Sequence, residues 1–200
     1  MAVQNDGRAL EGVSDRLKDN KEIVKIAVQN EGVALRYASD RLKNDVEIVK
    51  DAISNDYHAI DFIGEEARNN KDVLLTAIEN EIIGYRPYSD GGYESYVLTF
   101  FNKKFCSDRE VMMAAIKSNY SSIRFIDESL KNDKEIFKLA IENCTIKHWE
   151  KENLDSCTVD YYRTPIILEY AGDEIKNDKE IVELAISKDK ENVKFVGENL

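Results

Sequence analysis

Apolar side chains recur along the chain with a spacing of 25 residues. An Ala followed by Val or Ile marks this spacing at Ala2-Val3, Ala27-Val28, Ala52-Ile53, Ala77-Ile78, Ala115-Ile116, Ala140-Ile141 and Ala185-Ile186. A second apolar column, in the same register, reads Leu10, Leu35, Ile60, Leu98, Ile123 and Leu168. An aromatic column two residues further on reads Tyr37, Phe62, Phe100, Phe125, Tyr170 and Phe195. Self-similarity at such a period is the signature of a repeat architecture.

Each repeat is predicted to form two short helices. In the clearest one, the first helix covers about Val33 to Lys43, because Leu35, Ala38 and Leu42 fall on one helical face. Asn44 is expected to cap the second helix, since Glu47 follows at capping-box spacing. This helix should run to about Ser54, with Asn55 and its equivalents ending it in a left-handed conformation. Gly7 and Gly32 should assist the turns that follow.

These elements predict an all-α fold, namely a right-handed-type α-solenoid of antiparallel helix pairs. Helices of about ten residues are marginal alone and gain stability by stacking on neighbouring repeats. We expect a single helical-repeat domain over residues 1–200. Its units lie near 2–26, 27–51, 52–76, 77–114 with an insertion, 115–139, 140–184 with an insertion, and a partial unit 185–200.

The repeat motif resembles a known family. The segments Ala34-Leu35-Arg36-Tyr37-Ala38-Ser39, Leu42-Lys43-Asn44-Asp45 and Glu47-Ile48-Val49 are similar to the short tandem repeats called domain of unknown function 4116. The resemblance covers most of the chain apart from the two expanded connections. It implies a helical repeat scaffold, in an effector-like or host-interacting protein, and it carries no catalytic residues, since the family pattern consists of core and capping positions.

Composition narrows the classes of partner and the compartment. The formal net charge of −11 should repel phosphate backbones, so direct binding of nucleic acid is not expected, whereas a basic protein partner is favoured. No signal-peptide pattern and no apolar stretch long enough to span a bilayer is visible. Three scattered cysteines suit free thiols. We therefore expect a cytoplasmic protein, or one delivered to a host cytosol, with no membrane contact.

The regular spacing fails twice, where successive marker alanines are 38 and 45 residues apart. Both insertions fall between the second helix of one repeat and the first helix of the next. They are rich in the residue types that most often carry binding energy at interfaces. The predicted partner-binding residues are Tyr85, Arg86, Tyr88, Tyr93, Tyr96, Trp149, Tyr161, Tyr162 and Arg163. The alternative is that these side chains fold back and fill gaps between spread helix pairs.

Few residues of the sequence are candidates for catalysis, metal binding or phosphate binding, and the pattern around each of them is weak. Cys144, His148 and Cys157 could supply three zinc ligands, but no fourth ligand is apparent, and buried thiols with a surface histidine are the simpler interpretation. His58 lies at a repeat position that accepts unrelated residues, which disfavours a catalytic role. No glycine-rich phosphate loop is present, because Gly91-Gly92 is not followed by Lys-Ser or Lys-Thr. The sequence therefore predicts no enzyme, no metal and no cofactor.

The sequence supports two functional hypotheses. The first is a non-enzymatic scaffold for protein–protein interaction, whose partner docks on the edge formed by the two aromatic insertions. The alternative is an acidic inhibitor, or a decoy that mimics nucleic acid and blocks a basic site on a target enzyme. Phe195, Val196 and Leu200 lie at positions that a following helix would normally cover. Three explanations compete for this pattern: a fragment of a longer array, end-to-end self-association, or tolerated exposure.

Overall fold

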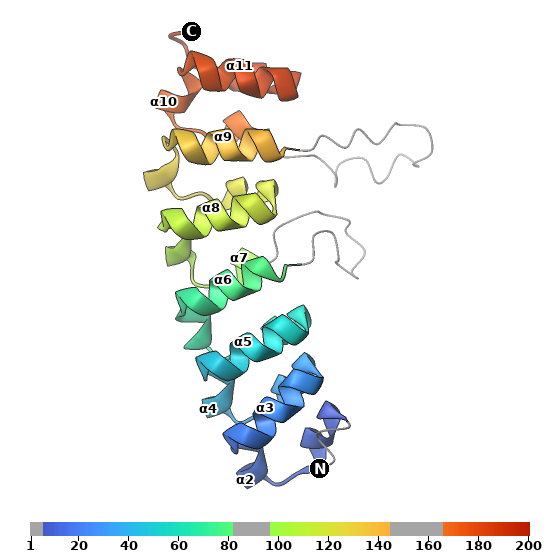
Figure 1. Ribbon diagram of the computed structural model, residues 1–200. Helices are drawn as coiled ribbons and strands as arrows, with labels where there is room; N and C mark the ends of the chain where they lie inside the picture. Colours follow the sequence, from blue (N-terminus) through green and yellow to red (C-terminus); the bar gives the residue numbers. More distant parts are fainter. Residues whose placement is uncertain (1–5, 82–96, 145–165) are drawn as a thin grey trace, which may run out of the picture. The chain divides into compact units, whose positions relative to one another are not determined.

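The described part of the protein consists of helices joined by short turns. The computed structural model describes residues 6–81, 97–144 and 166–200, and within these ranges it contains no strand (Figure 1). The described residues form two compact units. Unit 1 comprises 6–81 and 97–102, and unit 2 comprises 103–144 and 166–200.

Each unit alternates short 3₁₀- and α-helices with long α-helices of nine or ten residues. Unit 1 contains η1 (Gly7–Gly12), α2 (Asp15–Lys18), α3 (Lys21–Asn30), η2 (Gly32–Tyr37), α4 (Asp40–Lys43), α5 (Val46–Asn55), η3 (Tyr57–Phe62), η4 (Ala67–Asn69), α6 (Lys71–Glu79) and α7 (Val97–Phe100). Unit 2 contains η5 (Lys103–Ser107), α8 (Arg109–Ser118), η6 (Tyr120–Phe125), η7 (Glu128–Leu130), α9 (Lys134–Asn143), η8 (Ile167–Tyr170), α10 (Asp173–Lys176), α11 (Lys179–Lys188) and η9 (Lys190–Phe195).

The core of each unit lies between its long helices and its row of short helices. In unit 1 the helices α3, α5 and α6 lie side by side, and in unit 2 so do α8, α9 and α11 (Figure 1). The described marker alanines are fully buried, which lets neighbouring helices approach closely: Ala27, Ala52, Ala77, Ala115, Ala140 and Ala185. The predicted apolar column is also buried at Leu10, Leu35, Ile60, Leu98, Ile123 and Leu168. These columns supply the apolar burial that stabilises the short helices.

The first helix of the repeat is not continuous, contrary to the prediction for Val33 to Lys43. It divides into η2 and α4, because the backbone is extended at Ala38, where φ is −68° and ψ is 159°. The break allows Ser39 to cap α4, with its hydroxyl accepting a hydrogen bond from the Leu42 N–H at 3.3 Å. The Ser39 N–H in turn donates to the Lys18 carbonyl of the preceding repeat at 3.0 Å.

The N-cap of the long helix was predicted one residue too early. Asp45 caps α5, since its carboxylate accepts hydrogen bonds from the N–H groups of Glu47 and Ile48 at 3.1 and 3.2 Å. The Asn44 amide oxygen instead accepts from the N–H groups of Glu66 and Ala67, which belong to the next repeat. Asn44 therefore joins two repeats, while Asp45 satisfies the donors that a helix start leaves free.

A glycine opposite Asn44 makes this junction possible. A Cβ atom on Gly64 would overlap the Asn44 amide, and the Gly64 N–H donates to the Lys43 carbonyl at 2.8 Å. The same pairing recurs in unit 2, where Gly172 faces Asn132 and Gly197 faces Asn177. Each of these two glycines also donates to the preceding repeat, through the carbonyls of Lys131 and Lys176 respectively. The Asn–Gly pair is thus a recurring link between successive repeats.

The long helix α5 ends without the expected left-handed residue. Asp56 at its C-cap is extended, with φ −144° and ψ 114°. The Asn55 side chain acts between repeats instead, since its oxygen accepts from the Gly32 N–H at 2.7 Å and its amide donates to the Gln29 carbonyl at 2.8 Å. Gly32 is required for close approach, because a Cβ atom there would lie 2.8 Å from the Asp56 nitrogen and closer still to the Ala52 carbonyl.

Two large apolar side chains are strongly exposed in the described part of the chain. They are Val193 and Leu200, which are 59% and 53% exposed, while Phe195 and Val196 are half-buried. Val193 occupies the position of Leu168 one repeat earlier, which is fully buried. Self-association through this end remains a prediction. None of the described helices has the length and apolar character needed to cross a membrane.

Candidate interaction surfaces

The predicted partner-binding residues lie outside the described residues. Residues 82–96 include Tyr85, Arg86, Tyr88, Tyr93 and Tyr96, and residues 145–165 include Trp149, Tyr161, Tyr162 and Arg163. The described residues do define where each insertion joins the helices. The first follows α6 and precedes α7, and the second follows α9 and precedes η8. Each insertion therefore connects a long helix to the next short helix.

The repeats on either side of the first insertion remain linked. The Asn102 N–H donates to the Arg68 carbonyl at 3.4 Å, and the Asn102 side-chain amide donates to the Asn69 oxygen at 2.9 Å. The first of these hydrogen bonds occupies the same repeat positions as the one from Gly64 to Lys43. The repeats before and after the first insertion thus keep the kind of hydrogen bond that links uninterrupted repeats.

The second insertion is spanned in the same way. The Gly172 N–H donates to the Lys131 carbonyl at 2.8 Å, and the Glu174 N–H donates to the Asn132 side-chain oxygen at 3.2 Å. Lys134 on α9 also pairs with Asp178, the N-cap of α11. Within each unit, therefore, the insertion leaves the stacking of the short-helix row in place.

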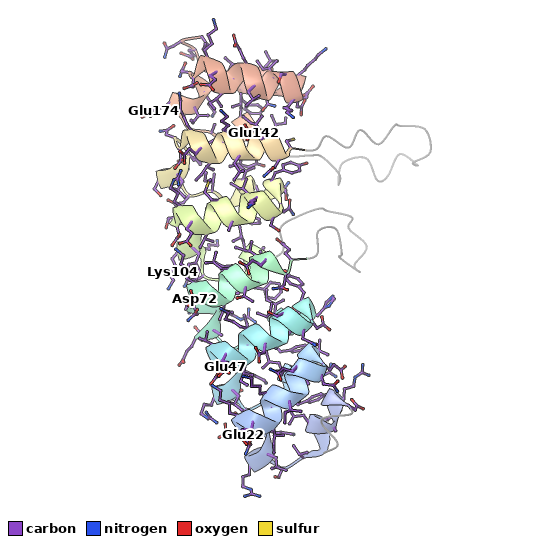
Figure 2. The ribbon with its side chains drawn as sticks, in the orientation of Figure 1. Glu22, Glu47, Asp72, Lys104, Glu142 and Glu174 are labelled. Carbon is purple, nitrogen blue, oxygen red and sulfur yellow. The ribbon has the colours of Figure 1, made fainter. Side chains whose placement is uncertain are left out.

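Ion pairs join the N-terminal ends of several neighbouring long helices, namely α3 with α5, α8 with α9, and α9 with α11. Figure 2 shows Glu22, Glu47 and Asp72 at these ends along one side of unit 1. Lys21, the first residue of α3, lies 2.9 Å from the carboxylate oxygens of both Asp45 and Glu47. In unit 2, Arg109 pairs with Asp133 at 2.6 Å and also with Glu135. In these pairs the cation that begins one long helix binds acidic residues at the start of the next, and the acidic residues also complement the helix dipole.

These pairs shift the pKa of Glu47 far from its ordinary value of 4.5. Hydrogen bonds from Lys25 and Lys21 lower the pKa of Glu47 to about 2. Since the folded protein holds this pKa below the unfolded value, the contribution to stability is present above about pH 4.5 and is lost as the pH falls toward 2.

Following the Glu47 carboxyl carbon by NMR should give a midpoint near pH 2. Changing both Lys21 and Lys25 to Ala should raise it toward 4.5, whereas the control Lys50→Ala should not, and an unchanged midpoint in the double variant would contradict this assignment.

The aromatic column of unit 1 is half-exposed rather than fully buried. We define the aromatic row as Tyr37, Phe62 and Phe100, which occupy equivalent positions in three successive repeats. The guanidinium carbon of Arg36 lies 4.8 Å from the Tyr37 ring centre and 5.9 Å from that of Phe62. The Arg68 guanidinium lies 5.5 Å from the Phe100 ring centre. Cations at these distances are attracted to the faces of the rings.

The two arginines differ in how many donors remain available. Arg68 donates to the carbonyls of Ile63 and Phe100 at 3.3 and 3.4 Å, so it is engaged within the fold. Arg36 is exposed and forms no ion pair with the carboxylates of the described residues. Sequence reasoning placed this column in the repeat register but did not identify it as a surface. The arginine directly before Tyr37 was the available signal.

Of the three residues considered as zinc ligands, Cys144 lies among the described residues. Cys144 is a buried C-cap of α9, and its pKa is raised mainly by burial. Burial and a contact with Cys144 raise the pKa of the Tyr120 hydroxyl to about 12. His148 and Cys157, the other residues considered for zinc, lie outside the described residues. Among those described, no group of three or more His, Cys, Asp or Glu side chains is arranged to hold a metal ion.

Comparison with known proteins identifies the repeat. The sequence profile described as "Domain of unknown function (DUF4116)" matches six overlapping segments, at residues 1–43, 27–66, 45–90, 93–130, 108–146 and 160–200. Comparisons with curated proteins and with solved structures give no match. Because the matched segments together cover nearly the whole sequence, the chain belongs to the DUF4116 family.

Proposed function

We propose that the chain is a non-enzymatic scaffold for protein–protein interaction, built as a right-handed-type α-solenoid with a 25-residue period. Its partner contacts the edge that carries the two insertions. The observation that supports this proposal is the set of hydrogen bonds that span each insertion, from Asn102 to Arg68 and from Gly172 to Lys131. Since the row of short helices stays linked across both insertions, the added residues are available for a role other than stacking.

Burial next to the insertions supports the same conclusion. In the repeat after the first insertion, Val97 and Leu98 are buried, and in the repeat after the second, Ile167 and Leu168 are buried. These positions reach the burial of the uninterrupted repeats, where Leu35 is fully buried. The core thus continues through the repeats that follow the insertions, as it does where no insertion is present.

The acidic decoy receives less support. A decoy needs carboxylates that face solvent without intramolecular partners, so that they can attract a basic site. Several carboxylates of this chain are paired with its own cations, including Asp45 and Glu47 with Lys21 and Asp178 with Lys134. The charges along the long-helix ends are therefore used to join repeats.

Capture from a lysate of the native host tests the proposal, with bound proteins identified by mass spectrometry. Changing Tyr85, Tyr88, Trp149 and Tyr162 together to Ala should remove a specific partner while leaving the helical circular dichroism unchanged. The matched control changes Glu22, Glu142 and Glu174 to Ala, which are exposed residues outside the insertions (Figure 2). Partner loss in the control but not in the aromatic variant would favour the decoy. Equal capture by wild type and the aromatic variant would refute the proposal.

A further inference from the structure

We propose that the surface formed by α11 and η9 binds an amphipathic α-helix of a partner protein. This helix is about ten residues long, with an acidic N-cap and a basic residue two positions after the N-cap. The surface consists of residues other than those of the insertions, and the inference does not depend on the proposed function. Its apolar side chains define the α11–η9 face: Ile186, Val193, Val196 and Leu200.

The α11–η9 face is uncovered, whereas its equivalents one repeat earlier are buried. Val193 and Leu200 are exposed, and the other two side chains of the face are half-buried. The residues at the same four positions of the preceding repeat are at most 5% exposed: Ile141, Leu168, Ala171 and Ile175. The element that covers those residues therefore indicates what the α11–η9 face accepts.

A long helix covers the equivalent face within each unit. In unit 2, α11 packs against both α9 and η8, and in unit 1, α5 packs against both α3 and η2. Each covering helix has ten residues and buries apolar side chains at positions i, i+1 and i+4, such as Ile181, Val182 and Ala185 of α11. Docking of such an apolar helical face against a hydrophobic surface is a recurring mode of peptide recognition. The occupant is accordingly a helix of about ten residues with this apolar pattern.

The first residue of α11 accounts for the acidic N-cap of the occupant. Lys134, the first residue of α9, pairs with Asp178, the N-cap of the helix that covers it. Lys179 has the same position on α11, and its side chain is 77% exposed, with Glu183 of the same helix at 3.9 Å. An acidic N-cap on the bound helix would pair with Lys179 and satisfy the first N–H groups of that helix.

Glu183 distinguishes the α11–η9 face from the equivalent faces of the other repeats. On α9 the equivalent residue is Lys138, which lies 3.7 Å from Glu180, the second residue of the covering helix. Glu183 replaces this cation by an exposed carboxylate. The equivalent residues of the other long helices are not acidic: Lys25, Lys50, Leu75, Met113 and Lys138. The helix bound at α11 should therefore carry a cation, not an acid, as its second residue.

The same charge disfavours a second copy of the chain as the occupant. In the part of the chain that the structure describes, the second residue of each long helix is acidic: Glu22, Glu47, Asp72, Glu110, Glu135 and Glu180. Any of these helices, placed on the α11–η9 face in the usual way, would bring this acid beside Glu183. Like charges in an interface repel, so the face favours a helix of another protein.

Two labelled peptides test the proposal on the whole chain. One has the sequence of residues 132–143 with the change Glu135→Lys, and the other keeps Glu135. Both carry the acidic N-cap Asp133 and the apolar pattern of a long helix, and they differ at the one residue that would face Glu183. Fluorescence anisotropy at low ionic strength should show saturable binding, with the Lys peptide bound about tenfold more tightly than the Glu peptide. Two-dimensional NMR should place the shifts at Val193 and Leu200.

Variants of the chain separate the two parts of the recognition. Glu183→Lys should reverse the preference, so that the Glu peptide binds about tenfold more tightly than the Lys peptide. Glu174→Lys makes the same change of charge at an exposed residue of α10 (Figure 2), and as the matched control it should leave the preference unchanged. Val193→Asp should weaken the binding of both peptides by about tenfold or more, because it places a charge within the apolar contact.

Three results would overturn the inference. The first is the absence of saturable binding by both peptides, and the second is equal binding of the two peptides to the wild-type chain. The third is a dimer of the chain alone, detected by light scattering, whose formation shifts the resonances of Val193 and Leu200, since this would assign the face to a second copy. None of these results would alter the capture experiment on the insertions, so the two proposals fail separately.

Discussion

Replacing Gly32 by alanine should destabilise the chain by about 2 kcal/mol, within the usual range for overpacking a close contact. The new methyl group would lie 2.8 Å from the Asp56 nitrogen and closer still to the Ala52 carbonyl. Both are backbone atoms at the end of α5, so no side chain can turn aside to make room. The shift would also disturb the 2.7 Å hydrogen bond from the Gly32 N–H to Asn55. Urea unfolding followed by circular dichroism measures the loss.

Gly12→Ala is the matched control, because no atom lies within 4 Å of a Cβ atom placed at that residue. Alanine there should change stability little or raise it slightly, through reduced freedom of the unfolded chain. Equal effects of the two substitutions would contradict the close approach of η2 to α5.

Replacing Phe137 by alanine should have the larger effect, a loss of about 3–5 kcal/mol. Phe137 lies on α9 and is the largest fully buried side chain in the described part of the protein. Its removal leaves a cavity that the backbone, held by the Asp133 cap and by the contacts of α9 with α8 and α11, can only partly close. The substitution should also lower the free energy of opening of unit 2. Amide hydrogen exchange measures this as faster exchange at the residues of unit 2.

Leu139→Ala on the same helix is the control for Phe137→Ala. Leu139 is half-buried, so its truncation removes fewer contacts and should cost about 1 kcal/mol or less. Comparable losses for the two variants would show that the burial of Phe137 does not determine the stability of unit 2.

The burial of the repeat columns could be predicted from the sequence. Ile48, Val49, Ala52 and Ile53 were assigned to the inner face of the second helix, and all four are buried in α5. Spacing alone suffices here, because a buried helical face leaves a regular apolar pattern. The family membership also follows from the same positions.

The junctions between repeats could not be predicted in the same way. Asn44 and Asp45 are both good capping residues, and local rules do not decide between them. What decides is the hydrogen bond from Glu66 to Asn44, between residues 22 positions apart. The break at Ala38 has a similar cause, since it places Ser39 against Lys18 of the preceding repeat. In both cases a contact with another repeat overrides the local pattern.

The exposure of surface residues was harder to predict from the sequence than the burial of core residues. The aromatic column has the same periodicity as the buried columns, and periodicity does not distinguish a half-exposed ring from a fully buried one. The pairing of Arg36 with the rings of two successive repeats emerges only from the stacking. The predicted residues of the insertions lie outside the described residues, so their role in binding stays a prediction.

The hydrogen bonds across the insertions have a practical consequence for protein engineering. Since Asn102 and Gly172 link each flanking repeat to its predecessor, the connections after α6 and α9 are suitable sites for loop grafting. Foreign peptides of various lengths could replace residues 82–96 or 145–165, because the cost of closing a longer loop grows slowly with its length. A library diversified at these two connections would turn the chain into a display scaffold.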